Sequence, residues 1–468
     1  MTGSEARFYT PAPDDGPDPV PDPVKECRVS GTESDDDRLR NTTQVVSRSR
    51  RSFLARGTAL VGGGLVAELA AGPAATAGPA AAEAPAGGRP GVPPGMTAPG
   101  ADTGAQPYGT PSPFEKNVVK NIPKTLKQYT SASVRTPLQE LDGIITPNGL
   151  FYERHHGGVP EIDPAQHRLM IHGLVERPLV LTMDDVRRFP SVSRIHFIEC
   201  SGNPDFKAIR AGRTASDLVG LVSCAEWTGV RLKTVLEEAG LKPGARWVIA
   251  EGADAAALTR SLPIAKCLDD ALLVYSQNGE RLRPQQGYPL RVLLPGYEGN
   301  MSVKWLRRLN VTDEPAYSRE ETAKYTDLMP DGTARQFTFT MEAKSVITRP
   351  SGTQRIGPGF TEITGIAWSG RGTIARVEVS VDDGRSWQDA QLQAPVLDKA
   401  LTRFRLAWTW NGEPAVIQSR ATDETGYVQP LFSELAGARG LNSFYHNNAV
   451  IPWRIAESGE VSNGYPKA

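Results

Sequence analysis

The pattern of hydrophobic and polar positions changes about two thirds of the way along this chain. Up to about residue 325, short apolar runs mix with amphipathic stretches in no regular order. This pattern predicts strands at 167–174, 195–198, 247–250, 271–275 and 290–294, and helices at 217–221 and 232–239. Because strands and helices do not alternate regularly, an α+β fold class is favoured over a doubly wound sheet for this region.

After Met341 the pattern is that of an all-β domain. Short strands are predicted at 363–368, 374–381, 387–392, 404–410 and 415–421. Asp382-Asp383-Gly384 lies between two of them and has the composition of a hairpin turn. This spacing of strands and turns is typical of an immunoglobulin-like sandwich reaching to about Ile451, a domain that more often mediates association than catalysis.

The first 112 residues lack the pattern of a packed domain. Ser49-Arg50-Arg51-Ser52-Phe53-Leu54 is followed by a weakly apolar segment and by small residues at 75–77, which is the form of a twin-arginine export signal. A membrane anchor is the alternative, but Glu68 and Pro73 interrupt the apolar stretch short of the ~20 residues that a spanning helix needs. We therefore expect an exported or periplasmic protein that does not span the membrane and that folds around a cofactor before export.

Five segments follow from these boundaries. We expect a signal region at 1–77, a Pro/Gly/Ala linker at 78–112, a catalytic domain at 113–335, an immunoglobulin-like domain at 336–455 and a tail at 456–468.

Charge and cysteine content narrow the chemistry. The formal net charge is -1 and no basic block follows the signal region, so nucleic acid is not an expected partner. Beyond the signal region the cysteines are Cys200, Cys224 and Cys267, an odd number that leaves at least one thiol outside an intramolecular disulfide. There is no Cys-x-x-Cys-His, so no covalent haem is expected in this chain, and the cysteine spacing fits neither iron–sulfur nor structural zinc sites.

The densest group of reactive side chains is at 150–160. Arg154 precedes His155 and His156, and Gly157-Gly158 follow. This composition predicts an irregular loop whose cationic and hydrogen-bonding groups converge on an anion, with glycines that allow close backbone approach. A solvated surface turn is the alternative. Adjacent residues of an extended segment point in opposite directions, which argues against both histidines binding one metal ion.

Two further groups stand at strand ends. Cys200 ends an apolar strand and precedes a Ser-Gly-Asn-Pro turn, where a thiolate can face a pocket and bind a transition metal. A buried, inert thiol is the alternative. Arg291 and Lys304 flank Pro-Gly and Gly turns and could hold a phosphate or other polyanion, or else pair with surface carboxylates.

Together these groups resemble the sulfite oxidase family of molybdenum–pterin enzymes. The motifs are Tyr-x-Arg-x-His-x-x-Val-Pro at 152–160, Cys-x-Gly-Asn at 200–203, Gly-Tyr-Pro-Leu-Arg at 287–291 and Val-Lys-Trp-Leu-Arg-Arg at 303–308. Finer features, at 328–332, 335–339, 397–404 and 440–443, are most similar to the molybdenum subunit of the sulfane dehydrogenases of the Sox system. The resemblance implies a mixed α/β molybdopterin domain followed by an immunoglobulin-like dimerisation domain.

The resemblance also implies a role for each matching residue. Cys200 matches the thiolate ligand of molybdenum. Residues at molybdopterin-binding positions are Tyr152, Glu153, Arg154, His155, His156, Asp254, Gln286, Arg291, Ser302, Val303 and Lys304. Arg154 and Tyr325 match catalytic residues, and a substrate-binding arginine from the sandwich is matched by both Arg403 and Arg405.

Some positions depart from animal sulfite oxidases. Gln286 replaces a histidine, His155 replaces an asparagine, and Pro204-Asp205 replaces an arginine pair. Fewer cations weaken the capture of a free dianion, so sulfane sulfur on a carrier protein stays open beside sulfite as the substrate.

The function implied is a periplasmic, molybdenum-dependent dehydrogenase that oxidises sulfite or protein-bound sulfane sulfur. Because this chain has no haem motif, a separate c-type cytochrome is the implied electron acceptor, and the sandwich implies a homodimer. A sulfoxide reductase using the same cofactor and a non-enzymatic secreted binding protein are the alternatives.

Overall fold

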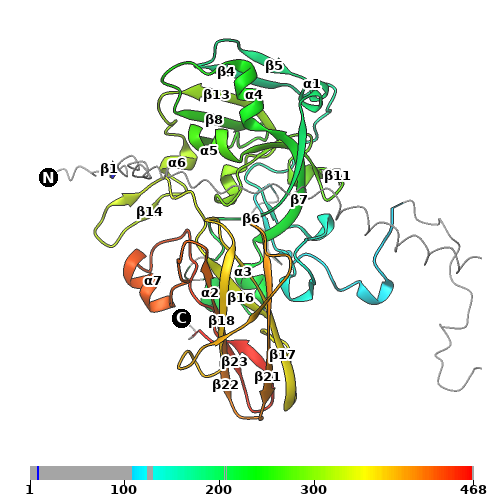
Figure 1. Ribbon diagram of the computed structural model, residues 1–468, viewed down its shortest axis with the longest axis vertical. Helices are drawn as coiled ribbons and strands as arrows, with labels where there is room; N and C mark the ends of the chain where they lie inside the picture. The colour runs from blue at the N-terminus through cyan, green and yellow to red at the C-terminus, as the bar shows by residue number, and fades with distance from the viewer. Residues whose placement is uncertain (1–7, 10–107, 124–129, 205, 207, 466–468) are drawn as a thin grey trace, which may run out of the picture. The chain divides into compact units, whose positions relative to one another are not determined.

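The computed structural model describes residues 8–9, 108–123, 130–204, 206 and 208–465 (Figure 1). The described residues 8–9 and 111–465 belong to one compact unit, and 108–110 belong to another. The twin-arginine motif at 49–54 and most of the expected linker therefore lie outside the described residues. Among the helices described, none combines the length and apolar character needed to cross a membrane.

The first part of the described chain, before β16 (Lys344–Arg349), contains two five-stranded sheets that are connected by short helices. One sheet has the order β11-β10-β7-β6, with β12 also paired to β10, and the other has the order β5-β4-β13-β8-β9. Among these strands, β4 and β13 pair in parallel and the other pairs are antiparallel. The predicted α+β class is confirmed. The strands are β4 (Leu169–Gly173), β5 (Leu179–Leu181), β6 (Ser191–Glu199), β7 (Val222–Arg231), β8 (Trp247–Gly252), β9 (Thr259–Pro263), β10 (Leu272–Gln277), β11 (Glu280–Arg281), β12 (Arg291–Leu293) and β13 (Leu306–Thr312).

Short helices connect and cover these sheets. They are α1 (Met183–Arg188), α2 (Ala208–Ala211), α3 (Ala215–Val219), α4 (Leu232–Ala239), α5 (Ile264–Asp269) and α6 (Arg319–Thr322). Helix α4 illustrates why the sequence predicts them: Leu232, Val235, Leu236 and Ala239 recur at helical spacing and all four are buried. The helix ends at Gly240, whose positive φ of 73° closes the last turn.

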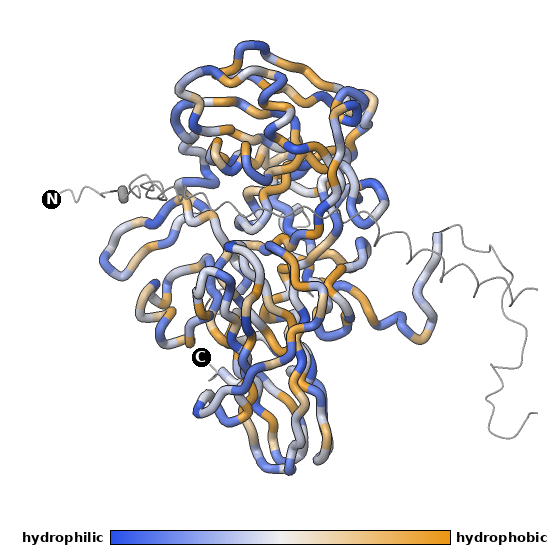
Figure 2. The backbone as a smooth tube through the Cα atoms, in the orientation of Figure 1, coloured by the Kyte–Doolittle hydropathy of each residue, from blue (hydrophilic) through white to orange (hydrophobic). Residues whose placement is uncertain are grey.

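The second part is a sandwich of two antiparallel sheets, as the sequence predicts. The sheets have the orders β16-β17-β21-β20 and β19-β18-β22-β23-β24. The elements are β16 (Lys344–Arg349), β17 (Gly359–Trp368), β18 (Ile374–Ser380), β19 (Gln388–Asp389), β20 (Gln391–Gln393), β21 (Thr402–Trp410), β22 (Ala415–Asp423), α7 (Phe432–Arg439), β23 (Trp453–Ile455) and β24 (Val461–Asn463). Figure 2 shows hydrophobic residues gathered along these strands and hydrophilic residues in many of the loops.

Two details of the sandwich bear on the sequence predictions. Asp383 and Gly384 have positive φ angles of 62° and 82° in the turn between the antiparallel strands β18 and β19, as a hairpin turn requires. Strand β24 lies within the segment expected to be a tail. The sheet continues there because Val461 is buried and packs in the sandwich core.

Three short strand pairs complete the fold. Strands β2 (Ser133–Val134) and β3 (Glu153–Arg154) are antiparallel. Strands β14 (Asp327–Leu328) and β15 (Ala334–Arg335) form a hairpin, and β1 (Phe8–Tyr9) pairs in parallel with β15.

One of the buried hydrophobic clusters contains residues from both parts of the chain. Phe206, Ile209 and Leu218, in and beside α2 and α3, belong to the same buried cluster as Trp368 and Trp453 of the sandwich. Figure 1 shows α2 and α3 lying against the sandwich strands. The sandwich is therefore packed into the first part rather than linked to it by a loop alone.

A buried ion pair crosses this shared core. Glu199, the last residue of β6, has no exposed surface, and its Oε1 lies 2.5 Å from Nζ of Lys344, which begins β16. Lys344 also donates to the carbonyl of Asn203 at 2.6 Å. Trp368 donates from Nε1 to Oε2 of Glu199 at 2.6 Å, and Nδ2 of Asn203 donates to Oε1 at 3.1 Å. Each charged group is thus paired and hydrogen-bonded, which offsets the cost of removing it from water.

A second set of buried charges joins the same two parts. His446 lies between Glu298 and Glu342, with Nε2 3.4 Å from one carboxylate and Nδ1 3.2 Å from the other. Although burial alone would lower the pKa of His446, its contacts with these two carboxylates raise it to about 9. The imidazole is therefore held in its charged form at neutral pH.

We expect Lys344→Met to lower the free energy of unfolding by about 3–5 kcal/mol, because it leaves the Glu199 carboxylate buried without its cation. Denaturant-induced unfolding measures the change. Arg376→Met is the control: Arg376 is exposed and pairs with Glu378 and Asp389, so its loss should cost about 1 kcal/mol or less. A cost as small for Lys344→Met as for the control would contradict the structure.

The raised pKa of His446 predicts a pH dependence of stability. A histidine of ordinary pKa 6.5 that rises to about 9 on folding stabilises the protein fully below pH 6.5 and loses that contribution as the pH rises through 9. The shift corresponds to about 3 kcal/mol. The free energy of unfolding, measured from pH 6 to pH 10, should fall over this range in the wild type. In His446→Gln that fall should be much smaller, and an equal fall in both proteins would rule out His446 as its source.

Candidate functional site

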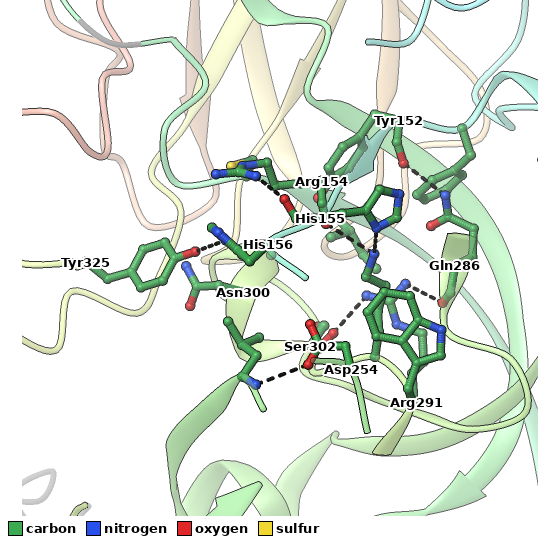
Figure 3. Close-up of a pocket in the computed structure, with 17 residues that line it drawn as sticks. Tyr152, Arg154, His155, His156, Asp254, Gln286, Arg291, Asn300, Ser302 and Tyr325 are labelled. Atoms are coloured by element: carbon green, nitrogen blue, oxygen red, sulfur yellow. Dashed lines mark hydrogen bonds between the residues drawn. The ribbon is translucent and has the colours of Figure 1, made fainter. Parts of the chain in front are cut away.

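One cavity brings together most of the candidate residues. The cavity opens to solvent, and about 680 Å³ of space within it and its opening is not filled by atoms. The candidate residues that line it are Tyr152, Arg154, His155, His156, Cys200, Asp254, Gln286, Arg291, Ser302, Lys304 and Tyr325. In Figure 3, Tyr325, His156 and Arg154 lie on one side of the cavity, and Gln286 and Arg291 lie on the other.

The loop after β3 forms one wall. Pairing of β3 with β2 and the hydrogen bond from the amide of His155 to the carbonyl of Ala132, at 3.0 Å, fix its start. A Cβ added at Gly157 would lie 2.5 Å from the backbone nitrogen of Ala256, so only glycine permits this approach. The expectation of an irregular loop with close backbone approach is therefore confirmed.

His155 and Lys304 are joined in this wall. Nε2 of His155 lies 3.0 Å from the Glu153 carboxylate, and Nδ1 lies 2.9 Å from Nζ of Lys304. Burial lowers the pKa of His155, so the neutral ring can donate to Glu153 and accept from Lys304. Nζ of Lys304 also donates to the carbonyls of Arg154 and Gln285, at 3.1 and 3.0 Å. Burial, reinforced by Arg291, lowers the pKa of Lys304 well below its usual value.

The opposite wall is built around Arg291, at the start of β12. Its Nη1 donates to the carbonyl of Gln286 at 3.0 Å and its Nη2 to the carbonyl of Ser302 at 2.8 Å. Burial lowers the pKa of Arg291 to about 10. Gln286 in turn donates from Nε2 to the carbonyl of Tyr152 at 2.9 Å, which ties the two walls together.

Cys200 lies where β6 ends and is half-buried at the cavity. Its amide donates to the carbonyl of Leu221 at 2.9 Å. Burial raises the pKa of the thiol, while the nearby Arg154 guanidinium opposes that shift. Cys224 and Cys267 are free thiols buried elsewhere, and in the described part of the chain no cluster of three or more His, Cys, Asp or Glu side chains could hold a metal ion.

Beside Cys200 lies a pair of neutral hydrogen-bonding groups. Nε2 of His156 is 3.1 Å from the hydroxyl of Tyr325. Burial and the neighbouring Arg154 lower the pKa of His156 to about 3, and burial raises the pKa of Tyr325. Both side chains are therefore uncharged at neutral pH, and among the residues that line the cavity the guanidinium of Arg154 is a cation near both.

A second cavity adjoins the first. The two share Arg154, His156, Cys200 and Tyr325. Cations around the second cavity are Arg135, Arg154, Arg319 and Lys324, against the carboxylate of Glu320, and Phe444 and Tyr445 of the sandwich part complete its wall. Cys200 thus also faces a cavity whose charged side chains are predominantly positive.

Four candidate residues do not line the first cavity. Glu153 contacts it only through His155, and Val303 is buried in the core of the first part. Arg403 donates to the carbonyls of Leu141 and Gly143, both at 2.6 Å. Arg405 is on the exposed side of β21, where Nε donates to Gln391 at 2.9 Å. Because β21 is held in register by β17 and β20, neither arginine is brought to Cys200.

Sequence reasoning missed residues that lie behind the site. Asn300 lines the cavity, and Arg260, only 1% exposed, donates to its side chain. The guanidinium carbon of Arg260 lies 4.9 Å from the ring centre of Tyr325. The signal that the sequence offered is Arg260 itself, a charged residue within the apolar strand β9, because a buried charge needs a buried partner.

The cavity fits a molybdopterin cofactor, which carries a dithiolene, a phosphate and a metal. Nε of Arg291 is buried and has no hydrogen-bond partner among the described residues. A Cβ added at Gly299 would come 2.7 Å from the Tyr152 hydroxyl, so this wall leaves no room for a side chain. Cationic and amide groups at one end would hold a polyanion, and Cys200 at the other end would supply a thiolate to the metal.

Comparison with known proteins gives the same assignment. Residues 156–320 match the family model of the oxidoreductase molybdopterin binding domain, and residues 335–452 match the Mo-co oxidoreductase dimerisation domain. The mitochondrial sulfite oxidase of Mus musculus is 34% identical over 318 residues, 62% of this chain and 58% of that protein. The chain thus spans about three fifths of the length of such mammalian relatives.

Two further relatives are matched over more of their length. Sulfite oxidase of Gallus gallus is 31% identical over 362 residues, 71% of this chain and 77% of that protein. The crystal structure of the sulfane dehydrogenase SoxCD from Paracoccus pantotrophus has a TM-score of 0.77 and 45% sequence identity, covering 80% of this chain and 98% of the matched one. The chain therefore belongs to the sulfite oxidase family of molybdopterin oxidoreductases.

Proposed function

We propose that this protein is a molybdenum-dependent dehydrogenase that oxidises sulfite or sulfane sulfur bound to a carrier protein. The observation that carries the proposal is the half-buried thiol of Cys200 beside Arg154, at the point where the first cavity meets the second, which is lined mainly by cations. When bound, the molybdenum cofactor supplies a metal that accepts two electrons from sulfur. The similarity to sulfite oxidases and to a sulfane dehydrogenase supports sulfur as the atom oxidised.

Arg154 would hold the anionic group of the substrate. In the described part of the chain its side chain donates through Nη1, to the carbonyl of His155 and, at 3.4 and 3.5 Å, to Ser131 and Ala132. Nη2 remains for an anion at the cavity. The neutral pair His156 and Tyr325 adds hydrogen bonds without adding charge. Arg154 therefore contributes the main electrostatic attraction at the reacting end.

The partners proposed are a c-type cytochrome and a second copy of this chain. Electrons leaving the metal need an acceptor, and the similarity to the sulfane dehydrogenase SoxCD supports a dehydrogenase that passes them to a partner. The match of residues 335–452 to a dimerisation domain supports a homodimer formed through the sandwich.

The twin-arginine motif at 49–54 supports export to the periplasm after the cofactor is inserted.

One preparation tests the proposed function. The full chain is produced with molybdate and an intact twin-arginine export system, and its molybdenum content is measured. Reduction of cytochrome c is then followed after addition of sulfite, or of a carrier protein loaded with thiosulfate. Molybdenum bound with cytochrome reduction is the expected result. A protein without molybdenum, or one that only reduces sulfoxides, would contradict the proposal.

Cys200→Ser should retain the pterin and lose turnover, because serine leaves the cavity intact but removes the thiolate. Fluorescence of the released pterin and cytochrome c reduction measure the two effects. The matched control is Cys267→Ala, which removes a thiol buried in α5 away from the cavity and should keep turnover. Near-normal activity of Cys200→Ser would remove this residue from its proposed role.

Arg154→Gln should chiefly raise KM for sulfite. A charge-assisted hydrogen bond to a desolvated anion contributes about 1.5–3 kcal/mol, or roughly 10- to 150-fold in KM. Steady-state kinetics at constant ionic strength measure it, and Arg376→Gln, exposed on the sandwich, is the control. The assignment of Arg154 fails if KM stays at the wild-type value.

A further inference from the structure

Arg260 lies directly behind the reacting end of the site. Its guanidinium carbon is 4.9 Å from the ring centre of Tyr325, and its Nη1 donates to Oδ1 of Asn300. Arg260 is itself 1% exposed and does not line the cavity. It contacts two residues that do, and Figure 3 shows those two, Tyr325 and Asn300, next to each other.

Two carboxylates fix the guanidinium from behind. Nη2 of Arg260 lies 3.1 Å from Oε1 of Glu298, and Nε lies 3.5 Å from Oε1 of Glu321. Glu321 is held in turn by Ser261, whose hydroxyl donates to Oε2 at 2.7 Å. A guanidinium with carboxylates on two of its edges has one orientation available, so the face that it presents to Tyr325 is fixed.

Glu298 connects this arginine to the sandwich. From Glu298 the contacts pass to His446 at 3.4 Å, to Glu342 at 3.2 Å and to Arg439 of α7 at 2.6 Å. Acidic and basic side chains alternate along the whole series, and every member is buried. The series, which we call the charge chain, consists of Glu321, Arg260, Glu298, His446, Glu342 and Arg439.

Both residues held by Arg260 need external support. Tyr325 has a φ of +55°, a backbone conformation that costs a non-glycine residue energy and persists only where the surroundings impose it. Nδ2 of Asn300 donates to the hydroxyl of Ser201 at 3.2 Å, next to Cys200. Loss of Arg260 would therefore release the tyrosine hydroxyl from His156 and loosen the turn that carries the thiol.

We propose that Arg260 is a positioning residue, which aims Tyr325 and Asn300 at the cavity, and that the charge chain makes the sandwich part of the active-site scaffold. The kinetic part of its test rests on the proposed function, whereas the structural part does not.

The test compares Arg260→Met and Arg260→Lys, each alone and combined with Tyr325→Phe. Because Arg260 acts through Tyr325, Arg260→Met should lower kcat for sulfite about 10-fold or more with KM changed less than about 3-fold. In the Tyr325→Phe background the same change should lower kcat less than about 3-fold, since coupled residues are not additive. Arg260→Lys, which keeps the charge, should recover part of the loss. An equal loss in both backgrounds would overturn the proposal.

A crystal structure of Arg260→Met gives a readout that does not depend on turnover. The 3.1 Å contact between Tyr325 and His156 should be lost, and a contact kept at that distance would overturn the proposal.

If Arg260→Met does not fold, Arg260→Met combined with Glu321→Gln keeps the charge of the cluster balanced and is measured in the same way. Arg376→Met, which removes an exposed arginine between two carboxylates, should change neither kcat nor this contact. A wild type that oxidises neither sulfite nor a thiosulfate-loaded carrier protein would count against the proposed function and leave the crystallographic test of Arg260 intact.

Discussion

The ion pair between Glu199 and Lys344 is the interaction on which the site depends. Glu199 is the residue immediately before Cys200, and consecutive residues of an extended segment point to opposite sides. With the carboxylate fixed in the core shared with the sandwich, the thiol is directed the other way, into the cavity. Separating the two side chains would leave each charge buried without a partner, which costs free energy, so both stay in position.

The turn after Cys200 is held from the same side. The amide of His446 donates to the carbonyl of Ser201 at 2.8 Å, and a Cβ on Gly202 would come within 3.0 Å of the Phe444 ring. Asn203 binds both Glu199 and the carbonyl of Val219. Residues more than 200 positions away in sequence thus hold the proposed metal ligand, which explains why a dimerisation domain shares a hydrophobic core with a catalytic one.

The sequence was informative where chemistry is local. Strand and helix positions follow from apolar spacing. The loop at 150–160 is indicated by arginine, histidine and glycine standing together, and the turn after Cys200 is indicated by Ser-Gly-Asn-Pro. The sequence was less informative where the outcome depends on long-range pairing. Arg403 and Arg405 both fitted a substrate role, and the structure places neither of them on the wall of the cavity. The links from Arg260 to Glu298 and from His446 to Glu342 leave no periodic signal at all.

The distribution of charge in the cavity bears on what it binds. Arg291 and Lys304 donate hydrogen bonds to backbone carbonyls, which fix the positions of both side chains. They can therefore attract a bound polyanion electrostatically without moving. At the thiol end the neighbouring histidine and tyrosine are neutral, and Arg154 alone of these lining groups brings positive charge. An anion at the thiol would therefore meet one guanidinium among the lining groups, with the buried Arg260 behind Tyr325 and further cations around the second cavity. Positive charge is thus spread around the thiol over several side chains rather than concentrated in one arginine cluster.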